Sequence, residues 1–325
     1  MVLEKDLFKK ILIDPANNSD ELCILTGYGS AAMAEYHLTK LVELDLFPSV
    51  NLTVGMTPLS GIDSVNHECF QEYTQRESDN FGCRYIIKGD PVHSKLYIWL
   101  SGGEPREAYI GSANYSQVAF VENESNFYNQ HELLVSSPPE EALTYYNRIN
   151  QGSALCTSPE IESKVSIAPI GKKPGNENFL EGLPSISVPL PKKSDGKMRN
   201  KSGLNWGFRG KRNKNEAYIQ LRPEVYKSDF FPPKPNRFTV YTDDGKKMIF
   251  TRAQKGREGD AIETPKGNSI LGRYLRKRLG LSSGQRVKIH HLEKYGRNYI
   301  DFYKIDAETY YMDFASSDNS KTKKR

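Results

Sequence analysis

The sequence is poor in cysteine and contains no long hydrophobic run. Its four cysteines, Cys23, Cys69, Cys83 and Cys156, are widely spaced and form no C-x-x-C pair, which argues against a structural zinc site and fits a reducing compartment. No stretch approaches the ~18 consecutive apolar residues of a membrane helix. The charged segment Met1–Lys10 lacks the apolar core of a signal peptide. We therefore expect a cytoplasmic protein that does not bind a membrane.

Acidic and basic residues are distributed unevenly along the 325 residues, a length that favours two domains. Residues 1–160 carry 10 Lys and Arg against 22 Asp and Glu, a net charge of −12. Residues 161–325 carry 35 against 18, a net charge of +17. This asymmetry indicates a polyanionic partner bound mainly by the second half. The alternative is a solvated basic face without a partner.

The first half alternates β-rich runs with helical patterns, which is typical of α/β folds. We expect this domain to span residues 1–160. Helices are expected at 31–44, 62–76 and 139–149. Strands are expected at 21–26, 51–56, 83–87, 92–100, 108–110 and 132–135. The Gly-Tyr-Gly-Ser turn at 27–30 lacks the further glycine or Lys-Ser/Thr of a phosphate-binding loop, so it is interpreted as a tight strand-to-helix turn.

A different pattern follows. Residues 161–200 are rich in Pro, Ser and Lys and are interpreted as a basic linker. In residues 201–310, one expected helix at 269–279 interrupts short β-type runs at 217–221, 238–241, 247–251, 286–290 and 299–303. This spacing favours an all-β barrel or sandwich with one helix. Residues 311–325 are expected to form a disordered basic tail.

Three polar motifs in the first half suit phosphodiester chemistry. His93 and Lys95 are two residues apart near the start of an expected strand, so both should project from one face. Ser112 and Asn114 belong to a Gly-Ser-Ala-Asn turn after the next strand, and Glu132 begins a third. An imidazole can attack phosphorus, an ammonium can neutralise nonbridging oxygens, and hydroxyl and amide groups can stabilise the developing charge. A carboxylate beside an imidazole fixes its orientation.

These motifs resemble the phospholipase D superfamily, whose signature is H-x-K-x4-D followed by G-S-x-N. The position of the usual Asp is Leu100 here. That departure is characteristic of the restriction endonucleases of the BfiI and NgoFVII type, in which a downstream Glu completes the site. Glu132 is the favoured candidate for this acid, while Glu122 and Glu124 remain open. The resemblance implies His93 as nucleophile or leaving-group acid, Lys95 as phosphate clamp, and Ser112 and Asn114 as phosphate donors.

The chain contains a single H-x-K, because neither His67 nor His290 begins another. The mechanism of the superfamily uses two imidazoles, one to attack and one to protonate the leaving oxygen. The resemblance therefore implies a homodimer through the nuclease domain, with both imidazoles at a two-fold axis. It implies no metal and no cofactor.

Two basic loops of the second half resemble the N-arm and C-arm of the plant B3 DNA-binding pseudobarrel. The candidate DNA contacts are Arg209, Lys211, Arg212, Asn213 and Asn215 in the first loop, Arg252, Gln254, Lys255 and Arg257 in the second, and Asn268 before the helix. Arg and Asn suit base reading, and Lys suits phosphate contacts. The basic residues of the helix, Arg273, Arg276, Lys277 and Arg278, are either a phosphate-facing edge or a solvated face. Trp206 is interpreted as packing.

The expected fold is therefore a phospholipase D-like, mixed-sheet α/β nuclease domain followed by an all-β pseudobarrel that binds DNA. The expected function is that of a type II restriction endonuclease, which hydrolyses double-stranded DNA at a specific sequence without metal through a dimeric His-Lys site and a phosphohistidine intermediate. The sequence leaves a helicase-like ATPase partner open. The alternatives are a phospholipase D-type lipid phosphodiesterase and a non-catalytic DNA-binding regulator on a nuclease scaffold.

Overall fold

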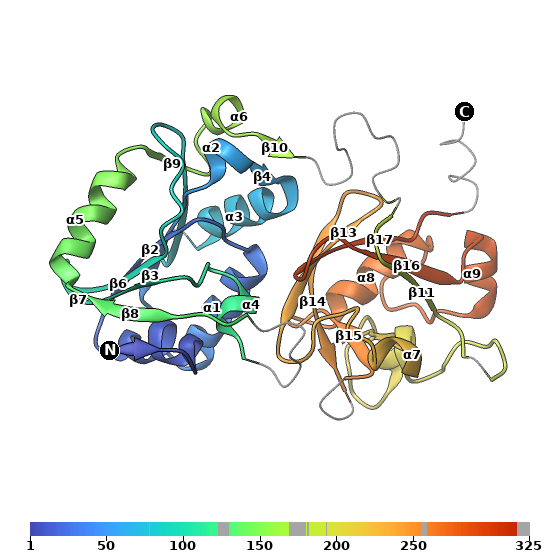
Figure 1. Cartoon of the computed structure of the whole chain (residues 1–325). Coiled ribbons are helices and arrows are strands. Elements are labelled where there is room, and N and C mark those ends of the chain that lie inside the picture. Colours follow the sequence, from blue (N-terminus) through green and yellow to red (C-terminus); the bar gives the residue numbers. More distant parts are fainter. Residues whose placement is uncertain are drawn as a thin grey trace. The chain divides into compact units, whose positions relative to one another are not determined.

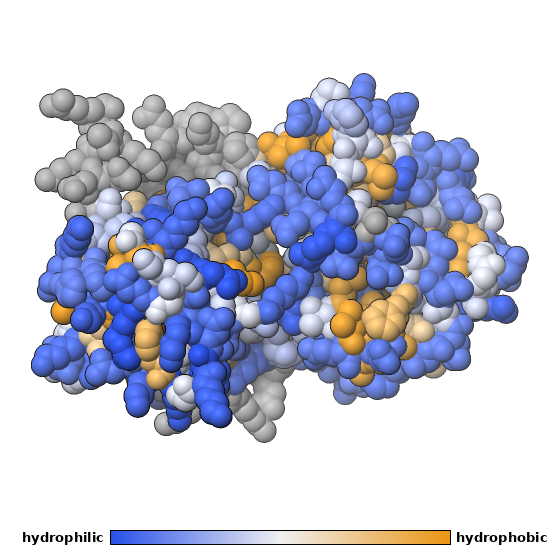
Figure 2. All heavy atoms as spheres, turned by 180° about the vertical axis from the view of Figure 1, so that it is seen from behind, coloured by the Kyte–Doolittle hydropathy of each residue, from blue (hydrophilic) through white to orange (hydrophobic). Residues whose placement is uncertain are grey.

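The computed structural model describes residues 1–77, 79–122, 130–168, 180, 182–192, 194–254 and 259–316. The chain divides into two compact units, Met1–Phe179 and Leu180–Arg325 (Figure 1). Within the described ranges, no helix is both long enough and apolar enough to cross a membrane. The face drawn in Figure 2 is mostly hydrophilic, with its hydrophobic residues in separate small patches.

Unit 1 is built on an eight-stranded mixed sheet with the order β1-β8-β7-β6-β2-β3-β5-β9. Strands β2, β3 and β5 are parallel, whereas β6, β7 and β8 form an antiparallel meander beside β2. The strands are β1 Val2–Leu3, β2 Glu21–Thr26, β3 Ser49–Val54, β5 Phe81–Ile86, β6 Leu96–Ser101, β7 Glu104–Gly111, β8 Leu134–Ser137 and β9 Ser153–Leu155. The mixed α/β class expected from the sequence is confirmed.

Helices cover the sheet of unit 1 because its central strands are apolar on both faces. In β2, Cys23 and Leu25 belong to a core cluster shared with Tyr146 of α5, while Leu22 and Ile24 are fully buried on the opposite face. Helix α5 packs on β6 and β7, and α3 packs on β5. The helices are η1 Phe8–Ile13, η2 Asp14–Asn17, α1 Ala31–Glu43, α2 Thr57–Ser60, α3 Ser64–Arg76, α4 Gln117–Phe120, α5 Pro139–Asn150 and α6 Ile161–Lys164.

Two strands of unit 1 begin later than the sequence predicts, and both shifts affect site residues. Strand β6 begins at Leu96, so His93 and Lys95 lie in the loop before it. Strand β8 begins at Leu134, so Glu132 also precedes its strand. In both places the backbone pairs with a turn from elsewhere in the sheet, at Gly55 and at Ser112 respectively.

Unit 2 is a seven-stranded sheet with the order β11-β16-β17-β13-β14-β15-β12. All neighbouring strands are antiparallel except β13 and β17. The strands are β11 Ser185–Pro189, β12 Ile219–Gln220, β13 Arg237–Thr242, β14 Lys247–Ala253, β15 Ala261–Glu263, β16 Tyr299–Lys304 and β17 Thr309–Asp313. The helices are η3 Gly203–Phe208, α7 Pro223–Tyr226, α8 Ser269–Arg278 and α9 Ile289–Tyr295. This β-rich architecture confirms the pseudobarrel class.

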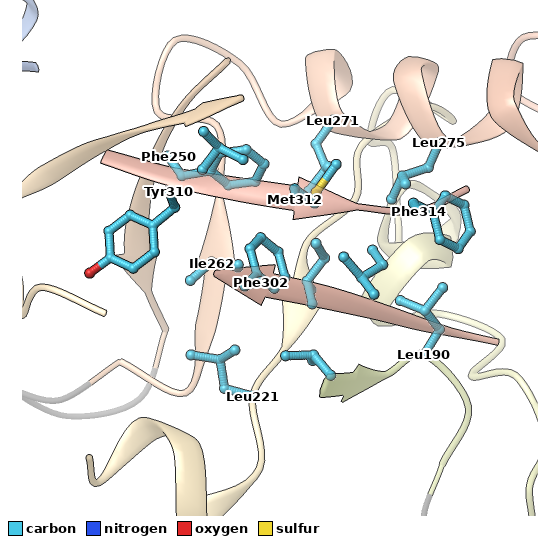
Figure 3. Close-up of a cluster of buried hydrophobic side chains, with 14 of the residues drawn as sticks. Leu190, Leu221, Phe250, Ile262, Leu271, Leu275, Phe302, Tyr310, Met312 and Phe314 are labelled. Carbon is cyan, nitrogen blue, oxygen red and sulfur yellow. The ribbon is translucent and has the colours of Figure 1, made fainter. Parts of the chain in front are cut away.

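One hydrophobic core holds unit 2 together. Leu271 and Leu275 project from α8 toward the strands, where they meet Phe302, Met312 and their neighbours (Figure 3). Burying side chains of this size contributes about 1.5–3 kcal/mol each. The alternating burial of the strands therefore sets which side chains remain on the outer face.

Several boundaries differ from the expectations. Strands lie inside the expected linker 161–200: β10 (Ile167–Ala168) pairs with β4 (Ile62–Asp63), and β11 pairs with β16. Val188 of β11 is buried in the core of unit 2, which is why this segment is a strand despite its flanking prolines. The expected strand 286–290 is wrong, because α9 begins at Ile289. Strand β17 ends within the expected tail, whose residues 317–325 lie outside the described residues.

Candidate active site and nucleic-acid interface

The loop that carries His93 is fixed to the end of β3. The Val92 backbone N–H donates to the Gly55 carbonyl at 2.9 Å. A Cβ on Gly55 would lie only 2.1 Å from the Val92 carbonyl oxygen, so a side chain there would displace the loop. Ser94 points to the other side, where its hydroxyl lies 2.8 Å from that of Tyr145 on α5. His93 itself stays exposed.

The ammonium of Lys95 is held against His93. Lys95 is only 6% exposed, and its Nζ lies 3.1 Å from both His93 ring nitrogens. It also donates to the His93 backbone carbonyl at 2.7 Å. Burial lowers the pKa of Lys95, and the negative charge of Glu132 opposes this shift. The sequence indicates that the two side chains project from one face of a strand, whereas in the structure they meet in the loop before β6.

The Gly-Ser-Ala-Asn turn is joined to the segment before β8. Ser112 N–H donates to the Leu133 carbonyl at 3.0 Å, and Leu133 N–H donates to Ser112 Oγ at 3.0 Å. The Ser112 hydroxyl in turn donates to the Glu132 carboxylate. A Cβ on Gly111 would lie 1.9 Å from the Leu133 carbonyl oxygen, so only glycine allows this approach.

Asn114 meets His93 at the end of β2. The Tyr28 backbone N–H donates to Asn114 Oδ1 at 3.2 Å, and Thr26 Oγ1 lies 3.3 Å from the same oxygen. A Cβ on Gly27 would lie 3.1 Å from His93 Cδ2 and 3.4 Å from Asn114 Oδ1, so both side chains border this glycine. Because Oδ1 is occupied by donors, the Asn114 amide NH₂ is the group that can donate to a phosphate.

The turn at 27–30 thus contributes to the site in a way that the sequence analysis missed. Gly27 and Tyr28 contact site residues, and the Tyr28 ring stands edge-on to His93 with centroids 6.2 Å apart. The available signal was the glycine-rich turn at the end of an apolar strand. The sequence by itself indicates only a tight turn, because β2 and the Gly-Ser-Ala-Asn turn are distant in sequence.

The structure distinguishes two of the three candidate acids. Glu132 contacts the Ser112 hydroxyl and influences Lys95. Glu122 instead accepts from the Asp6 backbone N–H at 2.5 Å. Glu124 lies outside the described residues. Of the two described candidates, Glu132 is therefore the acid that lies among the other site residues.

Other titratable groups of unit 1 have structural contacts. His37 is fully buried between the Leu12 carbonyl and the Tyr115 hydroxyl, and burial lowers its pKa to about 4. His67 is buried beside the Tyr85 hydroxyl. In the part of the chain that the structure describes, no three or more His, Cys, Asp or Glu side chains are grouped so that they could hold a metal ion.

In the first basic loop of unit 2, the guanidinium of Arg212 stacks on an aromatic ring. Arg212 lies 3.9 Å above the Trp206 ring and donates to Glu216 at 2.6 Å. Trp206 packs edge-on against Tyr218. The packing role expected for Trp206 fits this arrangement. The other expected contacts of this loop that remain exposed are Arg209, Lys211 and Asn213.

Two expected DNA contacts are instead buried within unit 2. The Asn215 side chain donates to Ser283 Oγ at 2.9 Å and accepts from the Gly284 N–H at 2.7 Å. The Arg252 guanidinium donates to the carbonyls of Gly259 and Tyr226. Their polar groups tie loops together, because a buried amide or guanidinium must find partners inside the fold. This arrangement does not favour contact with bases.

The remaining expected contacts differ in exposure. Gln254 is exposed, in a left-handed conformation with a φ of 66°. Lys255 and Arg257 lie outside the described residues. Asn268 is half-buried before α8, and its side chain makes no capping hydrogen bond.

Helix α8 has basic residues of two kinds. Arg276 is buried and donates to the carbonyls of Leu204, Gly272 and Gln285, while Arg278 forms an ion pair with Asp243 at 2.7 Å. Both therefore stabilise unit 2. Arg273 and Lys277 are exposed. The helix is thus neither uniformly a phosphate-facing edge nor uniformly a solvated face.

Two family models match the chain, one for each unit. Residues 5–163 match the N-terminal phospholipase D domain of the NgoFVII restriction endonuclease, and residues 178–306 match its C-terminal B3-like DNA-binding domain. No curated protein sequence matches.

Two solved structures are similar to part of the chain. NucT from Helicobacter pylori has 14% sequence identity, covers 48% of this chain and 97% of its own, and gives a TM-score of 0.32. Phosphatidylserine synthase from Haemophilus influenzae Rd KW20 has 18% identity, covers 44% of this chain and 35% of its own, and gives a TM-score of 0.27. At these TM-scores neither similarity bears on the reaction. The two matching family models cover both units, and the chain therefore belongs to the NgoFVII restriction endonuclease family, as a restriction enzyme with a phospholipase D-like nuclease domain and a B3-like DNA-binding domain.

Proposed function

We propose that the chain is a type II restriction endonuclease that hydrolyses DNA at a specific sequence without a metal ion. The observation that carries this proposal is the cluster at the loop before β6. There the imidazole of His93 and the ammonium of Lys95, both in one loop, lie near the amide of Asn114 from the turn after β7. A phosphate at this place would meet a nucleophile, a cation and a hydrogen-bond donor.

The proposed reaction has two displacements. The His93 imidazole attacks phosphorus, an N–P bond forms, and the P–O bond to the leaving oxygen breaks as a second imidazole gives that oxygen a proton. Water then attacks the phosphohistidine, the N–P bond breaks, and the second imidazole takes the proton of the water. Lys95 neutralises the nonbridging oxygens throughout. Glu132, which accepts from Ser112, orients this hydroxyl and balances the charge of Lys95.

The second imidazole would come from a second copy of the chain, because only one H-x-K exists in the sequence. Apolar side chains at the rim of the site support such an interface. Tyr28 beside His93 is 46% exposed, and Ile110 and Leu133 beside the Gly-Ser-Ala-Asn turn are 42% and 43% exposed. A two-fold axis through this rim would bury them and bring two copies of His93 to one phosphate.

The two alternatives fit less well. A lipid phosphodiesterase gives no reason for the net charge of +17 in residues 161–325. A non-catalytic regulator gives no reason to keep a buried lysine beside an exposed histidine, because burying an ammonium costs free energy. DNA hydrolysis uses both features.

A cleavage assay on plasmid and phage DNA tests the proposal. The wild type should cut DNA, and His93→Ala should lose at least the ~10²–10⁴-fold that a missing acid or base costs. His131→Ala is the matched control, because His131 is exposed near Glu132 without being part of the motif, and it should keep its activity. Equal activity of His93→Ala and wild type, or hydrolysis of phosphatidylcholine vesicles but not of DNA, would contradict the proposal.

A further inference from the structure

Strands β12, β14 and β15 form the outer face of unit 2 between its two basic loops, and few long side chains project from it. In β12, β14 and β15, the side chains of Ile219, Phe250 and Ile262 point into the core. Strand alternation therefore places Gln220, Thr251, Ala253 and Glu263 on the outer face, where each is partly exposed. Thr251 and Ala253 are short, so a DNA backbone could approach closely there. Only Gln220 and Glu263 reach outward.

The two longer side chains differ in their partners. Gln220 Nε2 donates to the Asp260 carbonyl at 2.7 Å, so this side chain is held at the surface of unit 2. Glu263 is half-buried and makes no side-chain hydrogen bond within the described residues. A partly desolvated carboxylate that receives no hydrogen bond from its own fold costs free energy. The carboxylate is therefore free to accept a hydrogen bond from a bound molecule.

Two cations lie near Glu263, Arg212 of the first basic loop and Lys234, which contacts the second. Arg212 lies on the Trp206 ring, and Trp206 packs against Tyr218. Tyr218 lies opposite Glu263 on the neighbouring strand, because Ile219 and Ile262 are paired. Lys234 donates to the Gln254 carbonyl of the second loop at 2.5 Å. Burial raises the pKa of Glu263, while the charges of Arg212 and Lys234 lower it. These cations favour the ionised form, but Arg212 is already bonded to Glu216.

We propose that Glu263 is a specificity-determining residue whose carboxylate accepts a hydrogen bond from the exocyclic amino group of a cytosine in the major groove. This inference rests on the proposed function. A carboxylate only accepts, so it is repelled by phosphates and by base edges that present acceptors alone. Cytosine N4 and adenine N6 are the major-groove donors, and adenine places the acceptor N7 beside its donor. Cytosine is therefore the base that fits Glu263.

The test compares the sequences at the ends of phage DNA digested by full-length wild type, Glu263→Gln and Glu263→Ala. The matched control is Glu293→Gln, an exposed acid on α9. The wild type and Glu293→Gln should require a cytosine at one position. Both Glu263 variants should relax that position by about tenfold or more, the discrimination expected of one good base contact, and keep the other positions. Glu263→Gln preserves the shape of the side chain, and thermal unfolding checks that each variant is folded.

Three results would overturn the inference while leaving the proposed function intact. They are an unchanged preference at every position in both folded variants, an equal loss of cleavage at all sequences, and a recognition sequence made only of A·T pairs. If Glu263→Gln does not fold, the Glu263→Ala profile decides. If neither variant folds, Glu263 is a structural residue and the inference fails. A failure of the proposed function looks different, because wild-type chains would then leave ends without any common sequence, or would not cut DNA.

Discussion

At the residue scale, the site depends on small residues as much as on reactive ones. Gly55 and Gly111 each let a carbonyl approach within a distance that a Cβ would forbid, and these approaches place the loops that carry His93 and Glu132. Gly27 has no side chain, so His93 and Asn114 can both lie close to it. The motif is enough to identify the reactive side chains. It does not predict the distances between them, because glycines distant in sequence set those distances.

Asn114→Ala tests the orientation derived for this side chain. Its Oδ1 is occupied by Tyr28, so its NH₂ group should stabilise the charge that develops on phosphate. We expect kcat for DNA cleavage to fall by about 10²–10³-fold, as for the loss of an oxyanion donor, with DNA binding retained. Asn18→Ala, at an exposed position outside the site, is the control. An unchanged kcat would show that Asn114 only joins β2 to the turn.

At the scale of elements, apolar runs predicted strands well, and polar loops were predicted less well. Strand 21–26 was predicted to the residue, because its continuous apolar run is typical of a central strand. The partners of Asn215 and Arg252 lie at Ser283 and Tyr226, so no local pattern could show that these polar side chains are buried. Strand β11 was missed because prolines and serines surround its two inward-facing apolar residues.

The position of β11 predicts which fragment of unit 2 is stable. A fragment of residues 180–316 keeps the pairing of β11 with β16, whereas residues 201–316 leave that edge bare and remove Val188 from the core. The longer fragment should unfold at the higher temperature and bind DNA with an affinity that falls steeply as salt rises. Equal thermal stability of the two fragments would contradict the role assigned to β11.

At the scale of the whole molecule, the two halves of the chain carry opposite charge. Residues 1–160 have a net charge of −12, so a DNA strand approaching this half of the chain meets repulsion, which the ammonium of Lys95 offsets at the site. Residues 161–325, with +17, supply the general attraction. We therefore expect unit 2 to supply the affinity and sequence preference for DNA, and unit 1 to supply hydrolysis.

Mixing wild-type and His93→Ala chains tests whether two chains share one site. If both imidazoles act on one phosphate, mixed dimers should be nearly as inactive as the mutant homodimer. Under exchanging conditions, activity should then fall faster than the wild-type fraction. Mixing with His131→Ala chains is the control and should leave activity unchanged. A decrease in simple proportion to the wild-type fraction would show that each chain cuts independently.

The most direct test of the central claim is cleavage in excess EDTA, followed by sequencing of the ends. In the proposed mechanism, His93 and Lys95 take the roles that a metal has in other nucleases, which are supply of the nucleophile and neutralisation of charge. We therefore predict that the wild type cuts at a fixed position relative to one sequence in EDTA, and that His93→Ala does not. Cleavage that stops in EDTA and returns with magnesium, or that persists in His93→Ala, would contradict the account.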